Sequence, residues 1–215
     1  MRMFNPTRLS TVLGALLLGT SLSACAPLMV GSVITSALVA NDRRTSGAQL
    51  EDQSIELRAA NRLREQMGQR SNVYVTSYNR RVLLTGEVAN EQDKALVQSL
   101  VAGVENVRAV VNEVEVLGAS SLTQRSSDAL LTTRVKAAMI DARDLMASAV
   151  KVVTTRSTVY LMGRLTQREA DRAADIARNT QGVQRVVLVL EIISEAELAR
   201  LQPQPAPVRS ATPVQ

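Results

Sequence analysis

The feature that most constrains the fold is an internal repeat. The segment VYVTSYNRRVLLTGEV at 73–88 aligns without a gap on VKVVTTRSTVYLMGRL at 150–165, an offset of 77. A second segment, NVRAVVNEVEV at 106–116, aligns on GVQRVVLVLEI at 182–192 at an offset of 76. Self-similarity at a fixed spacing indicates that one structural unit occurs twice. The chain is therefore predicted to contain two domains of about 65 residues each.

Each copy predicts the order helix, strand, strand, helix, strand. Apolar residues recur at helical spacing at the start of each copy: Ile55, Ala59, Leu63 and Met67 in the first, and Leu131, Val135 and Met139 in the second. Two segments with period-two alternation follow, joined by short polar turns at 78–81 and 155–158. A second helix is expected at 90–102 and at 167–180, before a final Val-rich strand. We expect an α+β fold in which two helices pack on a three-stranded mixed sheet in each domain.

Four residues are expected to have structural roles. Gly86 and Gly163 lie in the second strand of each copy, where a glycine leaves room for a helix to cross closely or marks a bulge. They are not predicted to bind phosphate, because the chain has no G-x-G-x-x-G or Walker motif. Asn106 and Gly182 occupy equivalent positions, and both residue types tolerate the left-handed conformation of a helix C-cap. We expect them to end the second helices.

The N-terminus has the pattern of an export signal. Arg2 and Arg8 precede an uncharged run at 9–22, which ends in Leu22-Ser23-Ala24-Cys25. This end resembles the lipobox of bacterial lipoproteins, and the resemblance implies that Cys25 is acylated and becomes the first residue of the mature chain. Two alternatives are an ordinary signal-peptidase site and an uncleaved membrane anchor, because no charge occurs between Arg8 and Asp42.

The composition argues against catalysis and metal binding. The chain has no histidine and a single cysteine, so zinc, iron–sulfur and thiol–imidazole chemistry lack their usual ligands and bases. The serine and threonine residues have no evident base to activate them. We expect a non-enzymatic protein without cofactor or metal.

The two copies resemble the BON domain. The resemblance rests on V-x-V-x(6)-V-x-L-x-G in both hairpins and on G-V-x-x-V after the second helix, where the first copy has Asn106 in place of glycine. Two such domains behind a lipobox resemble the dual-BON lipoproteins of Gram-negative outer membranes. The resemblance implies a periplasm-facing protein that supports envelope integrity, with a role in cell division as a further option. No nucleic-acid partner is expected.

These features predict six segments along the chain. They are a signal peptide at 1–24, a lipidated N-terminus and tether at 25–50, a first BON domain at 51–117, a linker at 118–126, a second BON domain at 127–194 and a Pro-rich disordered tail at 195–215. The first segment of the tether, which is apolar, could also rest at the membrane interface. The first helix of the second domain is expected to start at a Ser-Asp cap, residues 127–128.

That helix is the predicted binding site. Residues 54–116 contain 8 Lys+Arg and 8 Asp+Glu, whereas residues 128–192 contain 10 against 7, a net charge of +3. Apolar and cationic residues outside the core-facing pattern are typical of insertion among anionic headgroups; they are Leu130, Arg134, Lys136, Ala137 and Ile140. Family resemblance implies an anionic phospholipid partner, phosphatidylglycerol or cardiolipin. Two alternatives remain: Leu130 and Ile140 pack against the first domain, or the paired domains bind an envelope protein that remodels the cell wall or assembles outer-membrane proteins.

Overall fold

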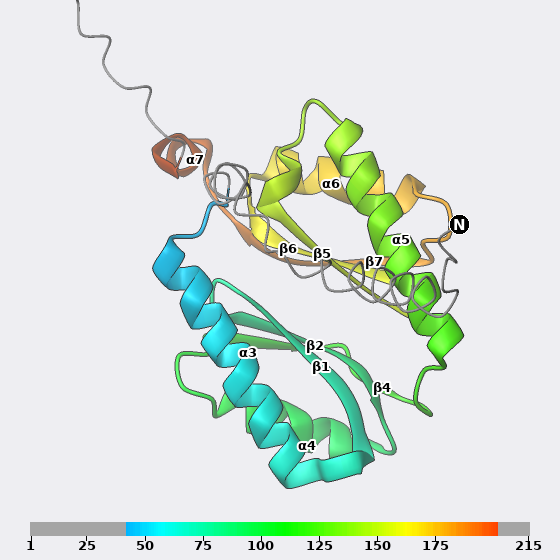
Figure 1. Cartoon of the computed structure of the whole chain (residues 1–215). Coiled ribbons are helices and arrows are strands. Elements are labelled where there is room, and N and C mark those ends of the chain that lie inside the picture. Colours follow the sequence, from blue (N-terminus) through cyan, green and yellow to red (C-terminus); the bar gives the residue numbers. More distant parts are fainter. Residues whose placement is uncertain (1–41, 202–215) are drawn as a thin grey trace, which may run out of the picture. The chain divides into compact units, whose positions relative to one another are not determined.

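The computed structural model describes residues 42–201, and both predicted domains lie within this range (Figure 1). The first domain consists of α3 (Ser46–Met67), a 3-10 turn (Gly68–Arg70), β1 (Ser71–Tyr78), β2 (Arg81–Val88), α4 (Glu91–Ala102), β3 (Ala109–Asn112) and β4 (Glu115–Val116). The second consists of α5 (Leu122–Asp141), a 3-10 turn (Ala147–Ala149), β5 (Val150–Thr155), β6 (Thr158–Leu165), α6 (Gln167–Asn179) and β7 (Arg185–Ile192), followed by α7 (Glu195–Leu201).

Both sheets are mixed, as expected. β1 pairs antiparallel with β2 and β5 with β6, while the last strand of each domain runs parallel to the middle strand. In the second domain that last strand, β7, is continuous. In the first domain it is divided into β3 and β4 at residues 113–114, where the Asn112 side chain accepts a hydrogen bond from the Val114 amide. The predicted α+β fold is confirmed, with this one break in the repeat.

The first helices begin earlier than the sequence pattern indicated. α3 starts at Ser46, so it includes the end of the expected tether, and α5 starts at Leu122, inside the expected linker. The N-caps are Thr45 and Ser121, whose side chains accept hydrogen bonds from the amides of Ala48 and Gln124. The Ser-Asp cap expected at 127–128 is therefore wrong. The expected tail also starts too early, because 195–201 form α7 and Leu198 is buried.

Each domain packs its helices on one face of its own sheet. In the first core Ile55, Ala59 and Leu63 of α3 meet Val82 and Leu84 of β2. In the second core Leu131, Val135 and Met139 of α5 occupy the corresponding places. The α4 and α6 helices cover the rest of the same faces (Figure 1). The predicted apolar stripes thus form the two cores.

The opposite faces of the two sheets pack against each other. Tyr78 and Leu83 of the first domain form one buried cluster with Tyr160, Met162 and Val189 of the second. These residues lie on the alternate positions of strands whose other positions face the helices, as the period of two requires. Within residues 42–201 the layers therefore run helices, sheet, sheet, helices.

Both hairpins share a support that the repeat preserves. The turns place two non-glycine residues in the left-handed region: Asn79 and Arg80 at φ 50° and 67°, and Arg156 and Ser157 at φ 49° and 59°. This conformation is the twist-matched two-residue hairpin turn, and it costs free energy for residues with a Cβ. A buried aspartate on the preceding helix compensates. Asp52 accepts hydrogen bonds from the amides of Asn79 and Arg80, both at 2.8 Å.

In the second domain Asp128 has the same role. It accepts hydrogen bonds from the amides of Arg156 and Ser157, both at 2.9 Å. Asp52 and Asp128 are separated by 76 residues, so the aspartate belongs to the repeat. Burial alone would raise the pKa of Asp52, but hydrogen bonds from the Arg80 amide, the Ser77 hydroxyl and Arg44 outweigh it and hold that pKa below its usual value.

The two strand glycines allow close contact between strands, not with a helix. Gly86 has φ +109°, and a Cβ there would lie 2.0 Å from the carbonyl oxygen of Asn72 in β1. A Cβ at Gly163 would lie 2.5 Å from the carbonyl oxygen of Ala149, just before β5. The expectation that a helix crosses at these positions is therefore wrong, since the close neighbour is the backbone of the adjacent strand segment.

Asn106 and Gly182 adopt the left-handed conformation at φ 67° and 98°. The helices before them, however, already end at Ala102 and Asn179. Each residue lies in the turn between helix and last strand, so neither is the C-cap as expected. The residue type was informative about the backbone conformation but not about the helix end.

Candidate functional site

The candidate site is the outward face of α5. One face of this helix buries Asp128, Leu131, Val135 and Met139 against the second sheet. The opposite face carries three large apolar side chains, of which Leu122 is 75% exposed, Leu130 61% and Ile140 72%. Exposure of Leu130 and Ile140 contradicts the alternative in which they pack against the first domain. α5 thus presents an apolar stripe that nothing within residues 42–201 covers.

Cations flank this stripe. Arg134 and Lys136, the two predicted cationic site residues, are exposed, and Ala137 is exposed between them and Ile140. Neither cation forms an ion pair or a side-chain hydrogen bond with another residue in the range 42–201. The same holds for Arg125 near the start of the helix and Arg143 just beyond its end. The only carboxylate on the outward face of this last turn is Asp141, which is also exposed.

The unpaired cations of α5 differ from the cations between the two domains, which form ion pairs. Between the two domains Arg156 pairs with Glu87, Lys151 with Glu56 and Arg185 with Glu113. These pairs neutralise charge where the domains meet. The unpaired cations of α5 instead face solvent beside apolar side chains, an arrangement suited to a surface that is both apolar and anionic.

The α5 helix is held rigidly by the domain interface. Asp128 ties it to the β5–β6 turn, and Arg156 of that turn donates from Nε to Glu87 of the first domain at 2.9 Å. Burial alone would raise the pKa of Glu87, yet the hydrogen bonds from Ser120, Asn72 and Arg156 keep it below the usual carboxyl value. The exposed face is therefore presented by a fixed frame.

Two arginines that precede α3 add to this frame, and sequence analysis missed them. Arg43 forms a buried, two-pronged ion pair with Glu169 of α6 at 2.7 Å and donates to the Arg164 carbonyl at 2.8 Å. The hydrogen bonds from Arg43 are the largest influence on the pKa of Glu169 and lower it, although burial of the carboxyl group acts in the opposite direction. Arg43 thus connects the segment before the first domain to the second domain.

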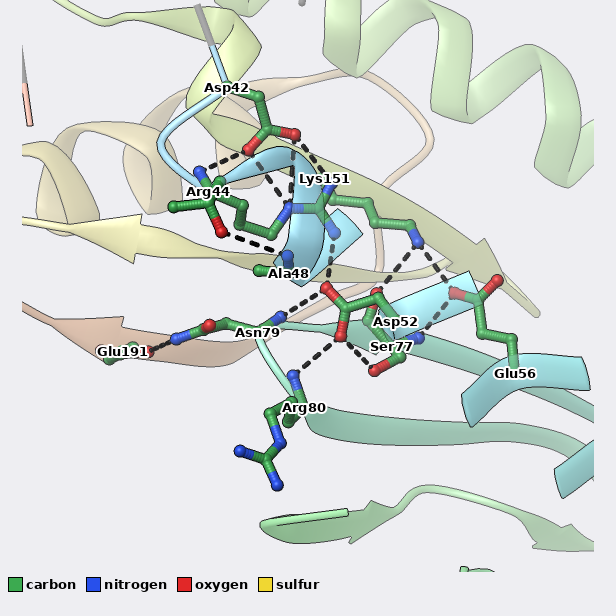
Figure 2. A network of polar contacts seen from close by, with 11 residues as sticks. Asp42, Arg44, Ala48, Asp52, Glu56, Ser77, Asn79, Arg80, Lys151 and Glu191 are labelled. Atoms are coloured by element: carbon green, nitrogen blue, oxygen red, sulfur yellow. Dashed lines mark hydrogen bonds and ion pairs between the residues drawn. The ribbon is translucent and has the colours of Figure 1, made fainter. Parts of the chain in front are cut away.

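Arg44 points the other way, into the first domain (Figure 2). It bonds Asp42 and Asp52, both at 2.7 Å, and its guanidinium lies 4.1 Å from the centre of the Tyr78 ring. On the same side, the Asn79 side chain donates to Glu191 of the second domain, and Lys151 donates to Glu56 and to the Ser77 carbonyl (Figure 2). Adjacent arginines thus clamp both domains where the chain enters the fold.

Some predictions are outside the described range. Cys25 and the rest of the signal and tether up to residue 41 are not among the described residues, nor are residues 202–215. Between residues 42 and 201, no helix is long and apolar enough to span a membrane. In the same range no cluster of His, Cys, Asp and Glu side chains has a geometry that would hold a metal ion.

The fold and its repeat agree with a known domain. The BON domain model matches residues 51–118 and 127–194. The chain belongs to the BON-domain family. These two matches coincide with the two sheets and their helices, so the tandem BON architecture predicted from the sequence is confirmed.

Two similar proteins extend this assignment. The chain is 38% identical over 183 residues to the outer membrane lipoprotein DolP of Haemophilus influenzae, covering 83% of this chain and 95% of that protein. It is 32% identical over 154 residues to a 21 kDa hemolysin of Actinobacillus pleuropneumoniae, covering 71% and 79%. The chain is thus a DolP-like outer-membrane lipoprotein, and the expected localisation is confirmed.

A structural comparison adds little. A structure of CdsD, a structural protein of the type III secretion system of Chlamydia trachomatis, covers 68% of this chain and 99% of its own at a TM-score of 0.28 and 13% identity. A likeness at this level supports no argument about the two-domain arrangement.

Proposed function

We propose that this BON-domain protein is a non-enzymatic, periplasm-facing lipoprotein that binds anionic phospholipid through the outward face of α5. Acylated Cys25 anchors it in the outer membrane, and mass spectrometry of the mature N-terminal peptide checks that attachment. The observation that carries the proposal is the apolar stripe of Leu122, Leu130 and Ile140, exposed on a rigid helix between unpaired cations.

The magnitudes favour weak binding that an anchor makes sufficient. Burying a leucine or isoleucine contributes about 1.5–3 kcal/mol. Each cation near an anionic membrane adds about 1 kcal/mol. Shallow insertion realises only part of the apolar gain, and Asp141 opposes the cations. Two or more acyl chains hold a protein stably at a bilayer, so α5 would only need to orient a domain already at the surface.

Liposome flotation tests this proposal. The chain is produced without residues 1–25, so that no acyl chain contributes, and is mixed with vesicles of phosphatidylcholine alone or with phosphatidylglycerol. We expect flotation only with phosphatidylglycerol, with a loss of about tenfold or more in Leu130→Glu/Ile140→Glu, since two carboxylates replace the apolar contacts. Added salt should weaken the binding.

A matched control is available on α3. Leu50 and Leu57 are 65% and 64% exposed, close to the values of the α5 residues. Leu50→Glu/Leu57→Glu therefore introduces the same charge at similar exposure and should float like the unmodified chain. Equal recovery with both vesicle types, or equal loss in both double variants, would contradict the assignment to α5.

The same pair of leucines supports the second candidate function, an interaction module for an envelope protein. Leu50 and Leu57 lie two helical turns apart on an exposed face of α3, which suits a protein contact. Crosslinking in cells should then trap a protein partner that Leu50→Glu/Leu57→Glu loses and Leu130→Glu/Ile140→Glu keeps.

A further inference from the structure

A cavity between the two domains has no role in the proposed lipid contact. It measures about 380 Å³ and lies between β1 and β2 of the first domain and α5 and β5 of the second. Cavities that bind small ligands measure roughly 300–1,000 Å³. Leu122, Leu130 and Ile140 are not in its lining, and Arg125 is the one residue that it shares with the cations beside the α5 stripe.

The cavity wall is rich in hydroxyl groups that have no partner. The Thr85 side chain lines it, is 1% exposed and forms no hydrogen bond with any residue in the described range. The hydroxyls of Thr76 and Thr155, also in the lining, lack partners in the same range. Buried polar groups nearly always have a hydrogen-bond partner, so the Thr85 hydroxyl is available to a bound molecule or water. The hydroxyls of Thr76 and Thr155, which are partly exposed, are available as well.

The charged residues of the lining restrict what that molecule can be. Glu87 and Asp128 contribute two buried carboxylates. An ionised carboxylate only accepts hydrogen bonds, so neither side chain can donate to a phosphate or carboxylate ligand, and Arg156 already pairs with Glu87. A ligand whose own hydroxyls donate and accept suits both the carboxylates and the threonines. Arg125, exposed and unpaired among residues 42–201, supplies one further donor at the cavity.

Tyr74 adds an aromatic surface. It lines the cavity and is 44% exposed, whereas Tyr78 and Tyr160 are 5% and 1% exposed. A half-exposed ring provides a flat apolar face for the C–H face of a sugar ring. The second domain has no equivalent aromatic residue, because the counterpart of Tyr74, 77 residues later, is Lys151.

We propose that this cavity binds a saccharide, with Tyr74 stacking on a sugar ring and Thr76, Thr85 and Thr155 bonding its hydroxyls. The site is assembled only when the two domains are docked, so occupancy would also stabilise their contact. The proposal does not depend on lipid binding by α5.

Calorimetric titration of the chain lacking residues 1–25 with tri-N-acetylchitotriose and with maltotriose tests the site. We expect a dissociation constant of about 1 mM or tighter for at least one of them. Tyrosine emission should change in parallel, because the chain has no tryptophan and Tyr74 is the one tyrosine of the three with substantial exposure. Inorganic phosphate and glycerol 3-phosphate, the anionic probes, should not compete.

Variants locate the binding. Tyr74→Leu should weaken it about tenfold, and Thr85→Val, which keeps the shape and removes the hydroxyl, about fivefold. Thr123→Val is the matched control, since Thr123 is an exposed threonine of α5 outside the cavity, and it should bind like the unmodified chain. Melting curves identify any variant that does not fold.

Three results would overturn the proposal: no binding of either saccharide, binding that both cavity variants leave unchanged, or binding of the anionic probes alone. Flotation of the same variants separates the two proposals, because Tyr74→Leu and Thr85→Val should float on phosphatidylglycerol vesicles as well as the unmodified chain does.

Discussion

The first helices of the two domains, α3 and α5, bury the same positions and expose different chemistry. Asp52, Ile55, Ala59 and Leu63 of α3 correspond at an offset of 76 to the buried residues of α5, which are Asp128, Leu131, Val135 and Met139. On the outside, Leu130 and Ile140 of α5 have Ser54 and Arg64 as their counterparts in α3. The repeat therefore preserves what the fold needs and leaves the solvent face free to differ.

The cations of the two helices differ as well. Arg58 of α3 bonds Glu51 at 2.7 Å, and Arg64 bonds Asn61 at 2.9 Å. Arg134, the counterpart of Arg58, has no partner within residues 42–201. A cation already bonded to a carboxylate offers little to an anionic surface, because the pair is close to neutral. This difference is one reason why we propose α5, and not α3, as the membrane contact even though α3 also exposes two leucines.

The largest difference between equivalent positions is expected at the strand glycines. In Gly86→Ala the new Cβ would lie 2.0 Å from a backbone oxygen, and the residue would also have to keep a φ of +109°. In Gly163→Ala the only obstacle is the distance of 2.5 Å from the new Cβ to a backbone oxygen. We expect Gly86→Ala to destabilise by about 4 kcal/mol or more, and Gly163→Ala by about 2–3 kcal/mol. Urea unfolding followed by circular dichroism measures both. Equal losses would show that strand shifts relieve the Gly86 strain.

The two turn aspartates, Asp52 and Asp128, should show the next largest difference in the free energy of unfolding. Asp52→Ala removes support from the Asn79–Arg80 turn and also leaves Arg44 and the Ser77 hydroxyl without that partner. Asp128→Ala removes turn support and a weaker bond from Gln124. We expect losses of about 3 kcal/mol and about 2 kcal/mol in the free energy of unfolding. Asp171→Ala, at an exposed carboxylate on α6, is the control and should change little. The opposite ranking would place the main anchor of the hairpins in the second domain.

How far the sequence alone reached depended on the range of the interactions. Val82, Leu84, Val159 and Leu161 signal their buried face through spacing, so both sheets and all four domain helices were predictable. The Asp52–Asp128 pair was also present in the repeat, but its role emerges only when the helix and turn are placed together. Arg43 gave no local signal, because its partner Glu169 is 126 residues away.

The predicted start of α5 was wrong for a similar reason. Ser127 and Asp128 form a plausible cap in sequence, yet the pattern cannot distinguish a capping aspartate from one that bonds a distant turn. The outward position of Leu130, Arg134, Lys136, Ala137 and Ile140 followed from the periodicity of α5 alone. The periodicity could not show that the rest of the described fold leaves these residues uncovered. That required the arrangement of the two domains, which contact each other through the sheet faces opposite the helices.

The smallest effect on stability, and the sharpest test of the comparison, comes from giving α3 the outward residues of α5. Ser54→Leu/Arg64→Ile in the chain that carries Leu130→Glu/Ile140→Glu should change the unfolding free energy by no more than about 0.5 kcal/mol, because both sites are exposed. If an apolar stripe alone determines binding, this variant regains flotation on phosphatidylglycerol vesicles. We expect little recovery, since Glu51 still bonds Arg58.

Adding Glu51→Gln frees that cation and should raise recovery by about fivefold, the equivalent of about 1 kcal/mol per cation at the membrane. Full recovery before Glu51 is changed would mean that unpaired cations contribute little and that the apolar residues of α5 are its decisive feature.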